Sequence, residues 1–344
     1  MNGRTDFRFA LCVAAALLAA VALRGHARAA DDDDALQKRI LKMNSITGND
    51  AIRAQMLELV KDKAAAKKLL QVADAMAKEK KDKIQYNAAY ILGRVALHLK
   101  ELDTALDLFK ICTDEATKLK SANKLEQAFN GNLAVLSQQK KYDEAKKLCL
   151  SMLEISGDEQ IQQFQLLVVQ EKLIRITAKL GKIDEAMKMV DELLAKSDDF
   201  WYFLEVKAAV QQEAGKYKEA AETYLTVLDK LDKSEGLKAE AKEGEMDGIR
   251  YALSGVYVEL NDIDKCAEQL QMLLKKHPDS PTYNNDLGFV WADHDKNLDE
   301  SEKMIRKAIE EDRKQRKANA DLLPDEDKDN AAYIDSLGWV LFKK

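Results

Sequence analysis

A six-residue motif recurs along the chain and limits the possible fold more than any other feature. Each copy is a short polar link that leads into a helical pattern and ends on a small side chain. The first copy reads KELDTA and the fifth reads NDIDKC. Successive copies lie 34 to 46 residues apart, a period typical of arrays built from pairs of helices. The copies end at Ala105, Ala145, Ala186, Ala220, Cys266 and Ser301.

The stretch Tyr251–Pro278 shows what one unit of this array contains. Two amphipathic segments, each long enough for three to four helical turns, are joined by the polar link Asn261-Asp262. Small residues, Ser254 and Cys266, occupy the place where the two predicted helices cross. Such a pair leaves apolar surface uncovered on both sides, so it needs neighbours of its own kind. Apolar residues at helical spacing mark the two buried faces: Leu253, Val256 and Tyr257, then Leu270 and Leu273.

A Leu-Gly pair recurs in the helix that precedes the link. It is found at Leu92-Gly93, Leu287-Gly288 and Leu337-Gly338. Glycine inside a helix costs about 1 kcal/mol relative to alanine, so its recurrence predicts the close approach of another backbone. A large side chain follows the link at Phe109, Tyr224 and Leu270.

Together, the Leu-Gly pair, the small residue after the link, the large residue beyond it and a terminal proline resemble the tetratricopeptide repeat. The resemblance covers about six and a half units, from roughly Tyr86 to Lys344. Single units depart from the pattern, since Asn132-Leu133, Leu173-Ile174 and Lys207-Ala208 replace Leu-Gly. The resemblance implies an all-α protein, a right-handed superhelical solenoid of antiparallel helix pairs whose concave face binds a peptide or partner protein.

The sequence divides into three parts. Residues 1–29 combine a basic start, an apolar run of about 15 residues and an Ala-x-Ala site, which predicts a signal peptide and export to the periplasm or cell envelope. An uncleaved anchor helix is the alternative. Residues 30–83 predict a helical capping segment or a degenerate repeat, with three helices between 35 and 83. Residues 84–344 form the array, with insertions near 231–247 and 313–330. The last helix either caps the array or precedes further repeats.

The net charge and the cysteines restrict the kinds of function and of covalent cross-link that we expect. Without residues 1–29 the chain has 50 Lys+Arg against 59 Asp+Glu, a formal net charge of −9, which argues against nucleic-acid binding. Three cysteines remain: Cys112, Cys149 and Cys266. An odd number in an exported protein raises the possibility of a disulfide. Because each lies at an apolar position of a second helix, we expect buried free thiols.

No catalytic or metal motif accompanies the repeats. The acidic stretch from Asp325 to Asp329 begins like a calcium loop, but its sixth position is Asn330 and its twelfth is Ser336. We therefore expect a solvated turn in which Asp329 or Asn330 caps the last helix. Neither cofactor nor metal is predicted, and the chain is interpreted as non-catalytic.

The family resemblance places the binding surface on the first helices, at positions that point away from the second helix. A matching Lys and Asn set for a carboxylate clamp is not found there. Packing of these side chains against the next unit is the alternative for each one.

The predicted function is an exported protein–protein interaction scaffold with no membrane contact after signal cleavage, or else a structural component of an envelope assembly held by the uncleaved anchor. The candidate binding residues are Tyr90, Arg94, Asn130, Arg175, Glu205, Tyr251, Phe289 and Trp339.

Overall fold

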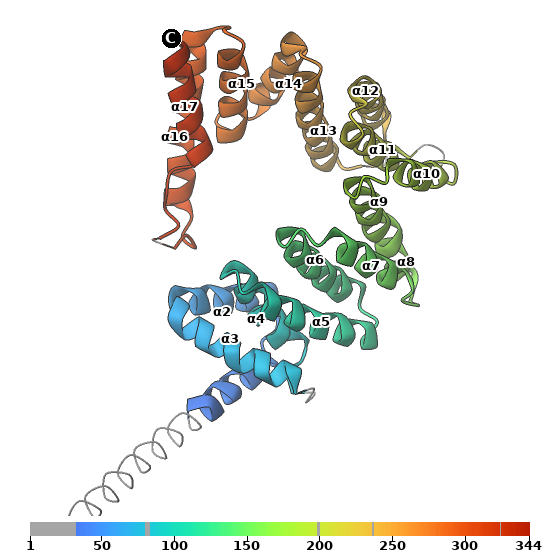
Figure 1. Ribbon diagram of the computed structural model, residues 1–344, viewed down its shortest axis with the longest axis vertical. Coiled ribbons are helices and arrows are strands. Elements are labelled where there is room, and N and C mark those ends of the chain that lie inside the picture. Colours follow the sequence, from blue (N-terminus) through green and yellow to red (C-terminus); the bar gives the residue numbers. More distant parts are fainter. Residues whose placement is uncertain (1–31, 80–82, 198–199, 236, 324) are drawn as a thin grey trace, which may run out of the picture. The chain divides into compact units, whose positions relative to one another are not determined.

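The computed structural model describes residues 32–79, 83–197, 200–235, 237–323 and 325–344, all of whose regular structure is helical (Figure 1). The chain divides into two compact units, Met1–Phe164 and Gln165–Lys344. The predicted signal peptide, residues 1–29, lies outside the described residues. The all-α repeat architecture predicted from the sequence is confirmed.

The first unit contains a helix at residues 32–43 and then seven labelled helices. The three helices predicted before residue 84 are present, and the helix predicted to begin after Gly48 begins at Asn49. The labelled helices are α2 (Asn49–Lys61), α3 (Lys63–Lys78), α4 (Tyr86–His98), α5 (Leu102–Lys118), α6 (Ala122–Gln138), α7 (Tyr142–Leu153) and α8 (Glu159–Phe164).

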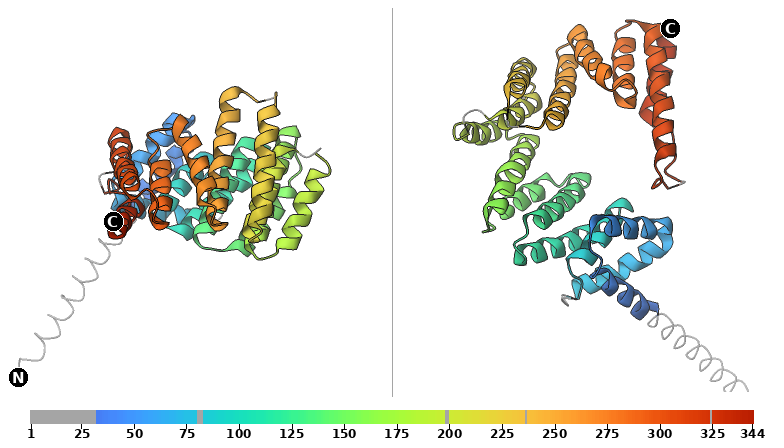
Figure 2. Two further views of the ribbon diagram at one scale, coloured as in Figure 1. Left: turned by 90° about the horizontal axis from the view of Figure 1, so that it is seen from above. Right: turned by 180° about the vertical axis from the view of Figure 1, so that it is seen from behind.

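The second unit begins with a π-helical turn, η1 (Gln165–Val169), and continues as helix pairs that pack side by side (Figure 2). Four pairs are followed by a single helix that packs on both members of the last pair. The pairs are α9 (Gln170–Lys179) with α10 (Ile183–Leu194), α11 (Trp201–Glu213) with α12 (Tyr217–Lys233), α13 (Ala239–Glu259) with α14 (Ile263–Lys276), and α15 (Pro281–Asp293) with α16 (Leu298–Ala318). The single helix is α17 (Ala331–Lys343).

The repeated motif works as a helix stop followed by a helix start. Its first residue has a positive φ in five copies, as at Lys100 (60°), Gly181 (76°) and Asn261 (55°). At the first copy, the N–H of Glu101 donates to the carbonyl of Ala96, which closes the preceding helix with a left-handed turn. Glycine and asparagine adopt this conformation at little cost, which explains their presence at the start of the link.

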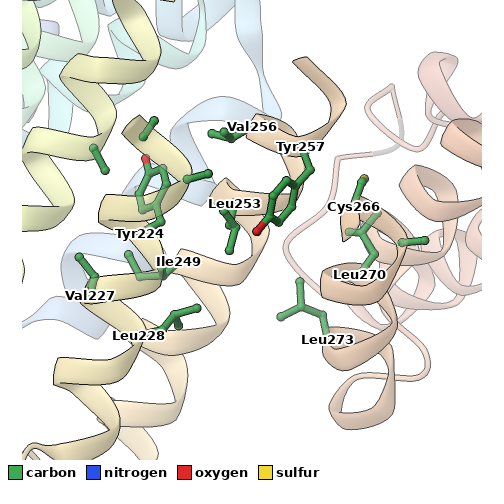
Figure 3. Packing of buried hydrophobic residues seen from close by; sticks show 14 of the residues in the cluster. Tyr224, Val227, Leu228, Ile249, Leu253, Val256, Tyr257, Cys266, Leu270 and Leu273 are labelled. Atoms are coloured by element: carbon green, nitrogen blue, oxygen red, sulfur yellow. The ribbon is translucent and has the colours of Figure 1, made fainter. Parts of the chain in front are cut away.

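The small residue that ends each motif is buried, as the sequence predicts. All six positions are at most 1% exposed. In the second unit one apolar core runs without a break from α12 through α13 to α14, and Leu253 of α13 lies between Tyr224 of α12 and Leu270 of α14 (Figure 3). Each pair therefore shields the side of the next, as expected for a repeat array.

The recurrent glycines serve different purposes, which corrects the prediction of a close backbone at each. At Gly288 a Cβ atom would lie 2.9 Å from the carbonyl oxygen of Ser301, so the backbone does approach there. At Gly93 the space is filled by the ring of Phe109, a side chain. At Gly338 a Cβ atom would meet nothing within 4 Å.

The first insertion in the array is largely helical, whereas the second is helical only up to Ala318. The first lengthens α13, whose Asp247 accepts hydrogen bonds from Lys276 Nζ at 3.0 Å and His277 Nε2 at 2.8 Å. The second lengthens α16 and returns to α17. There Arg313 and Arg316 of α16 bind the carboxylate of Asp329.

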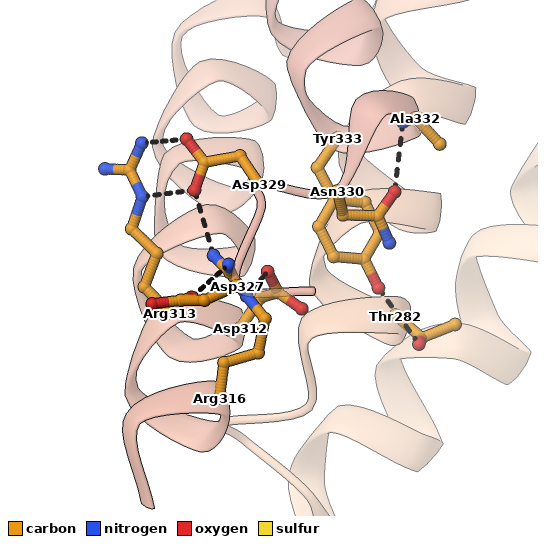
Figure 4. Close-up of polar contacts among 9 residues, drawn as sticks. All are labelled: Thr282, Asp312, Arg313, Arg316, Asp327, Asp329, Asn330, Ala332 and Tyr333. Atoms are coloured by element: carbon orange, nitrogen blue, oxygen red, sulfur yellow. Dashed lines mark hydrogen bonds and ion pairs between the residues drawn. The ribbon is translucent and has the colours of Figure 1, made fainter. Parts of the chain in front are cut away.

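Arg316 also binds Asp327, so two carboxylates of the calcium-like stretch are engaged by guanidinium groups (Figure 4). Asn330 caps α17 by accepting from the N–H of Ala332 at 3.0 Å, as one of the two predicted caps. Cys112, Cys149 and Cys266 are buried as predicted, and none of the three is in a disulfide.

Candidate partner-binding face

Seven of the eight candidate residues lie on first helices of their pairs. The eighth, Trp339, lies on the single helix α17, which takes the place of a first helix after the last pair, and the eight residues are divided between the two units. Three belong to the first unit: Tyr90 and Arg94 on α4, and Asn130 on α6. The other five belong to the second unit, one on each successive first helix: Arg175 on α9, Glu205 on α11, Tyr251 on α13, Phe289 on α15 and Trp339 on α17.

In the first unit the aromatic candidate is partly used in packing. Tyr90 is half-buried, and its ring stacks on Tyr86 with centroids 5.9 Å apart. Arg94 is exposed and donates through Nη1 to the hydroxyl of Tyr90 at 3.2 Å. Asn130 is exposed on α6. Tyr90 and Arg94 therefore form one small polar and aromatic patch on α4.

In the second unit Arg175 and Glu205 bind one another. Arg175 Nη2 donates to both carboxylate oxygens of Glu205, at 2.8 and 2.7 Å, and its Nε donates to the buried Glu171. Burial lowers the pKa of Arg175, but the negative charges of Glu205 and Glu171 have the larger combined effect. The pKa of Arg175 is therefore raised above its ordinary value. A partner that took Arg175 away would leave Glu171, which is only 5% exposed, with Lys172 as its remaining ion-pair partner, and would leave Glu205 without Arg175.

Tyr251 is 40% exposed, and its orientation is held from α15. Its hydroxyl donates to Asp286 Oδ2 at 2.8 Å, and its ring lies against Tyr283 with centroids 5.5 Å apart. Burial, then the hydrogen bond to Asp286, raises the pKa of Tyr251, so the hydroxyl stays protonated as a donor at neutral pH.

Phe289 and Trp339 are brought together at a pocket between α15 and α17. The pocket has a volume of about 460 Å³, and we refer to it as the α15–α17 pocket. The indole Nε1 of Trp339 donates to Asp293 Oδ1 at 3.1 Å, and its ring stacks on Phe342 with centroids 5.6 Å apart. The lining consists of Phe289, Asp293, Asp335, Gly338, Trp339 and Phe342.

Sequence reasoning missed the acidic residues of this pocket. Asp335 precedes Trp339 by four residues and Asp293 follows Phe289 by four, so each carboxylate lies one helical turn from a predicted aromatic residue. That spacing was the available signal. It could not show that α15 and α17 would place both carboxylates around one pocket.

The described residues offer little for catalysis. Among them, no three His, Cys, Asp or Glu side chains are grouped so that they could hold a metal ion. The buried thiols are poor nucleophiles, because burial raises the pKa of Cys112 above its usual range and that of Cys266 to about 11. The exposed residues of the first helices instead form a contact surface in which carboxylates lie beside aromatic side chains.

No helix in the part of the chain that the structure describes combines the length and apolar character needed to span a bilayer.

Comparison with known proteins finds one repeat by sequence and several solved structures with a similar fold. The sequence model of the tetratricopeptide repeat matches residues 250–280, the region that contains the link between α13 and α14. Residues 250–280 therefore match a tetratricopeptide repeat. The fold agrees with a tetratricopeptide repeat protein from Parabacteroides merdae ATCC 43184 at a TM-score of 0.50, with 11% identity over 84% of this chain and 99% of that one.

Two further solved structures are similar to this chain at lower TM-scores. The APC/C hetero-tetramer Cut9-Hcn1 gives a TM-score of 0.44 at 13% identity and covers 90% of this chain and 52% of that one. The MamA RS-1 ArsTM double mutant gives 0.37 at 18% identity and covers 55% and 96%. No match was found among curated proteins. The tetratricopeptide repeat fold indicates a protein–protein interaction scaffold, and proteins of this family are typically non-catalytic.

Proposed function

We propose that this protein is an exported, non-catalytic scaffold that binds a peptide or partner protein on the face formed by its first helices. The observation that carries the proposal is the row of exposed aromatic side chains on three successive first helices, Tyr251 on α13, Phe289 on α15 and Trp339 on α17, which are 37 to 40% exposed. Exposed aromatic residues are the usual anchors of protein interfaces. This face is the side predicted from the sequence to be concave.

Two of these anchors are oriented before any partner arrives. The hydroxyl of Tyr251 is tied to Asp286, and the indole of Trp339 is tied to Asp293. Both carboxylates lie on α15, on either side of Phe289 along the helix. Fixed rotamers reduce the entropy that binding would otherwise cost, which favours recognition by this row.

The remaining candidates have smaller roles in the proposal. Arg175 and Glu205 stabilise the packing of α9 against α11, because each satisfies the other's charge. Tyr90, Arg94 and Asn130 belong to the first unit and form a separate candidate surface.

Affinity capture from an envelope extract of the native host tests the scaffold. The full chain should retain a discrete set of proteins, and the double variant Phe289→Ser with Trp339→Ser should lose it. The matched control is Leu225→Ser, since Leu225 is an apolar side chain 46% exposed on the second helix α12. Equal loss with Leu225→Ser, or no loss with the double variant, would argue against the first-helix face.

Export rests on residues 1–29 and has its own test. The basic start, the short apolar run and the Ala-x-Ala site support cleavage before Ala30. Mass spectrometry of the protein from its native host should find an amino terminus near Ala30. A retained Met1 or Asn2 would instead favour the alternative, a component tethered by its amino-terminal helix.

A further inference from the structure

We propose that the α15–α17 pocket receives a basic side chain, a lysine or arginine, from the partner. This inference rests on the proposed scaffold function and specifies the chemistry that the scaffold recognises. It follows from three features of the pocket: its aromatic lining, its unbalanced negative charge and its size.

Aromatic side chains line the pocket from both helices. Phe289 comes from α15, and Trp339 and Phe342 come from α17, where Phe342 is 77% exposed. The faces of such rings carry partial negative charge and attract cations. The ring of Trp339 already lies 5.5 Å from the ammonium group of Lys343, so it attracts a cation within the chain itself.

The lining carries two carboxylates and no basic side chain. Asp293 accepts one hydrogen bond from Trp339, which leaves acceptor capacity on its carboxylate. Asp335 is exposed, and its carboxylate forms no ion pair or hydrogen bond with any other residue that the structure describes. The pocket therefore has a net negative charge that a partner could neutralise.

The nearby lysines do not pair with the two carboxylates of the lining, because their ion pairs are with other carboxylates, although Lys343 also lies beside the ring of Trp339. Lys343 Nζ binds Asp295 at 2.8 Å. Lys344 Nζ binds Asp299 and Glu302, both at 2.7 Å. These three carboxylates are not part of the lining, so Asp293 and Asp335 stay available to a ligand.

Other occupants fit the pocket less well. An acidic side chain would meet Asp293 and Asp335 as like charges. A wholly apolar side chain would cover these carboxylates without replacing their contacts with water, which is unfavourable. A pocket of about 460 Å³ has room for one long side chain together with its backbone. The aliphatic stem of lysine or arginine would contact the rings while its charged end meets the carboxylates.

A titration of the full chain monitored at its indole N–H signals tests the inference. The chain has three tryptophans, and Trp339→Phe identifies the signal of Trp339. Nα-acetyl-arginine amide and Nα-acetyl-lysine amide are the probes, and Nα-acetyl-citrulline amide is the neutral control with nearly the shape of arginine. We expect a saturable shift of the Trp339 signal with at least one cationic probe and a weaker effect with citrulline.

Asp335→Asn should weaken the binding of that cationic probe by about two- to fivefold, the effect of an exposed charge pair. The matched control is Glu243→Gln, which removes one negative charge at an exposed position of α13. It should leave binding unchanged. No saturable shift with either cation, equal binding of citrulline, or an equal effect of the two variants would overturn the inference.

These results are distinguishable from failure of the scaffold itself. If the Phe289→Ser and Trp339→Ser variant still loses its captured partners while citrulline binds as well as arginine, the scaffold stands and only the preference for a cation is wrong. If captured partners are insensitive to the double variant, the scaffold proposal fails whatever the probes show.

Discussion

Replacing two glycines of the same signature by alanine should have opposite effects on stability. Gly288 and Gly338 each follow a leucine at the same point of a first helix, but their surroundings differ. At Gly288 a new Cβ would lie 2.8 Å from Ile305 Cγ1 and 2.9 Å from the backbone oxygen of Ser301. At Gly338 it would meet nothing within 4 Å. Neither glycine has a positive φ, so backbone strain does not enter.

The magnitudes follow from two opposing effects. Alanine in place of glycine stabilises a helix interior by about 1 kcal/mol. Gly338→Ala should raise the free energy of unfolding by most of this amount, because α17 has room for the methyl group. Gly288→Ala should have the same gain in helix propensity. However, overpacking costs about 2 kcal/mol when the contacted atom belongs to the backbone and cannot move away as a side chain could. The net results are stabilisation by about 1 kcal/mol and destabilisation by about 1 kcal/mol.

Native-state hydrogen exchange is the suitable assay, because a repeat array need not unfold in one step. Both glycines border the core formed by α15, α16 and α17, so the slowly exchanging amides of α16 report on both. A difference of about 2 kcal/mol between the variants corresponds to about a 30-fold difference in exchange rate. Equal shifts of the same sign would refute the reasoning, since helix propensity alone would then explain both.

Further predictions concern the core, the thiols and the second insertion. Phe109→Ala should destabilise the first unit by about 3–5 kcal/mol, because the fully buried ring fills the space above Gly93; thermal unfolding monitored by circular dichroism measures this, and a shift equivalent to less than about 1 kcal/mol would contradict it. Cys112 and Cys266 should react with a thiol reagent only after unfolding, since burial raises the pKa of both; fast labelling of the folded protein would be the opposite result. Asp329→Asn should speed hydrogen exchange in residues 325–330 at neutral pH. Hydrogen bonding to Arg313 lowers the pKa of Asp329 to about 2. The stabilising effect of Asp329 is therefore complete above an unfolded pKa of about 4 and is lost as the pH falls through about 2. A difference between the variant and the original protein that was as large at pH 2 as at neutral pH would exclude this ion pair as the cause.

The repeated unit could be predicted from the sequence because its determinants are local. A small residue at the end of each link, such as Ala105 or Cys266, must be buried where two helices cross, and the helical period shows which face that is. The cap at Asn330 and the buried thiols follow from the same local reasoning, and the structure confirms them.

The contents of the candidate site could not be predicted, because they depend on neighbours far away in sequence. Arg175 and Glu205 are 30 residues apart and lie on different helices, so their ion pair requires the register between α9 and α11. The same holds for Trp339 and Asp293, which are 46 residues apart. The helical period identifies the exposed side of each helix but not the residue that an adjacent helix places beside it. The sequence also cannot show what a helical glycine faces, because an aromatic ring, another backbone or open space is compatible with glycine at that position.

Site-specific photocrosslinking in the native host tests the central claim most directly. A photoreactive phenylalanine analogue placed at Phe289 on the first-helix face should give discrete crosslinked species of the protein with a partner. The same analogue at Leu225, on the second helix α12, should give none of these species. If both positions gave the same products, or if only Leu225 gave any, binding through the first helices would be contradicted.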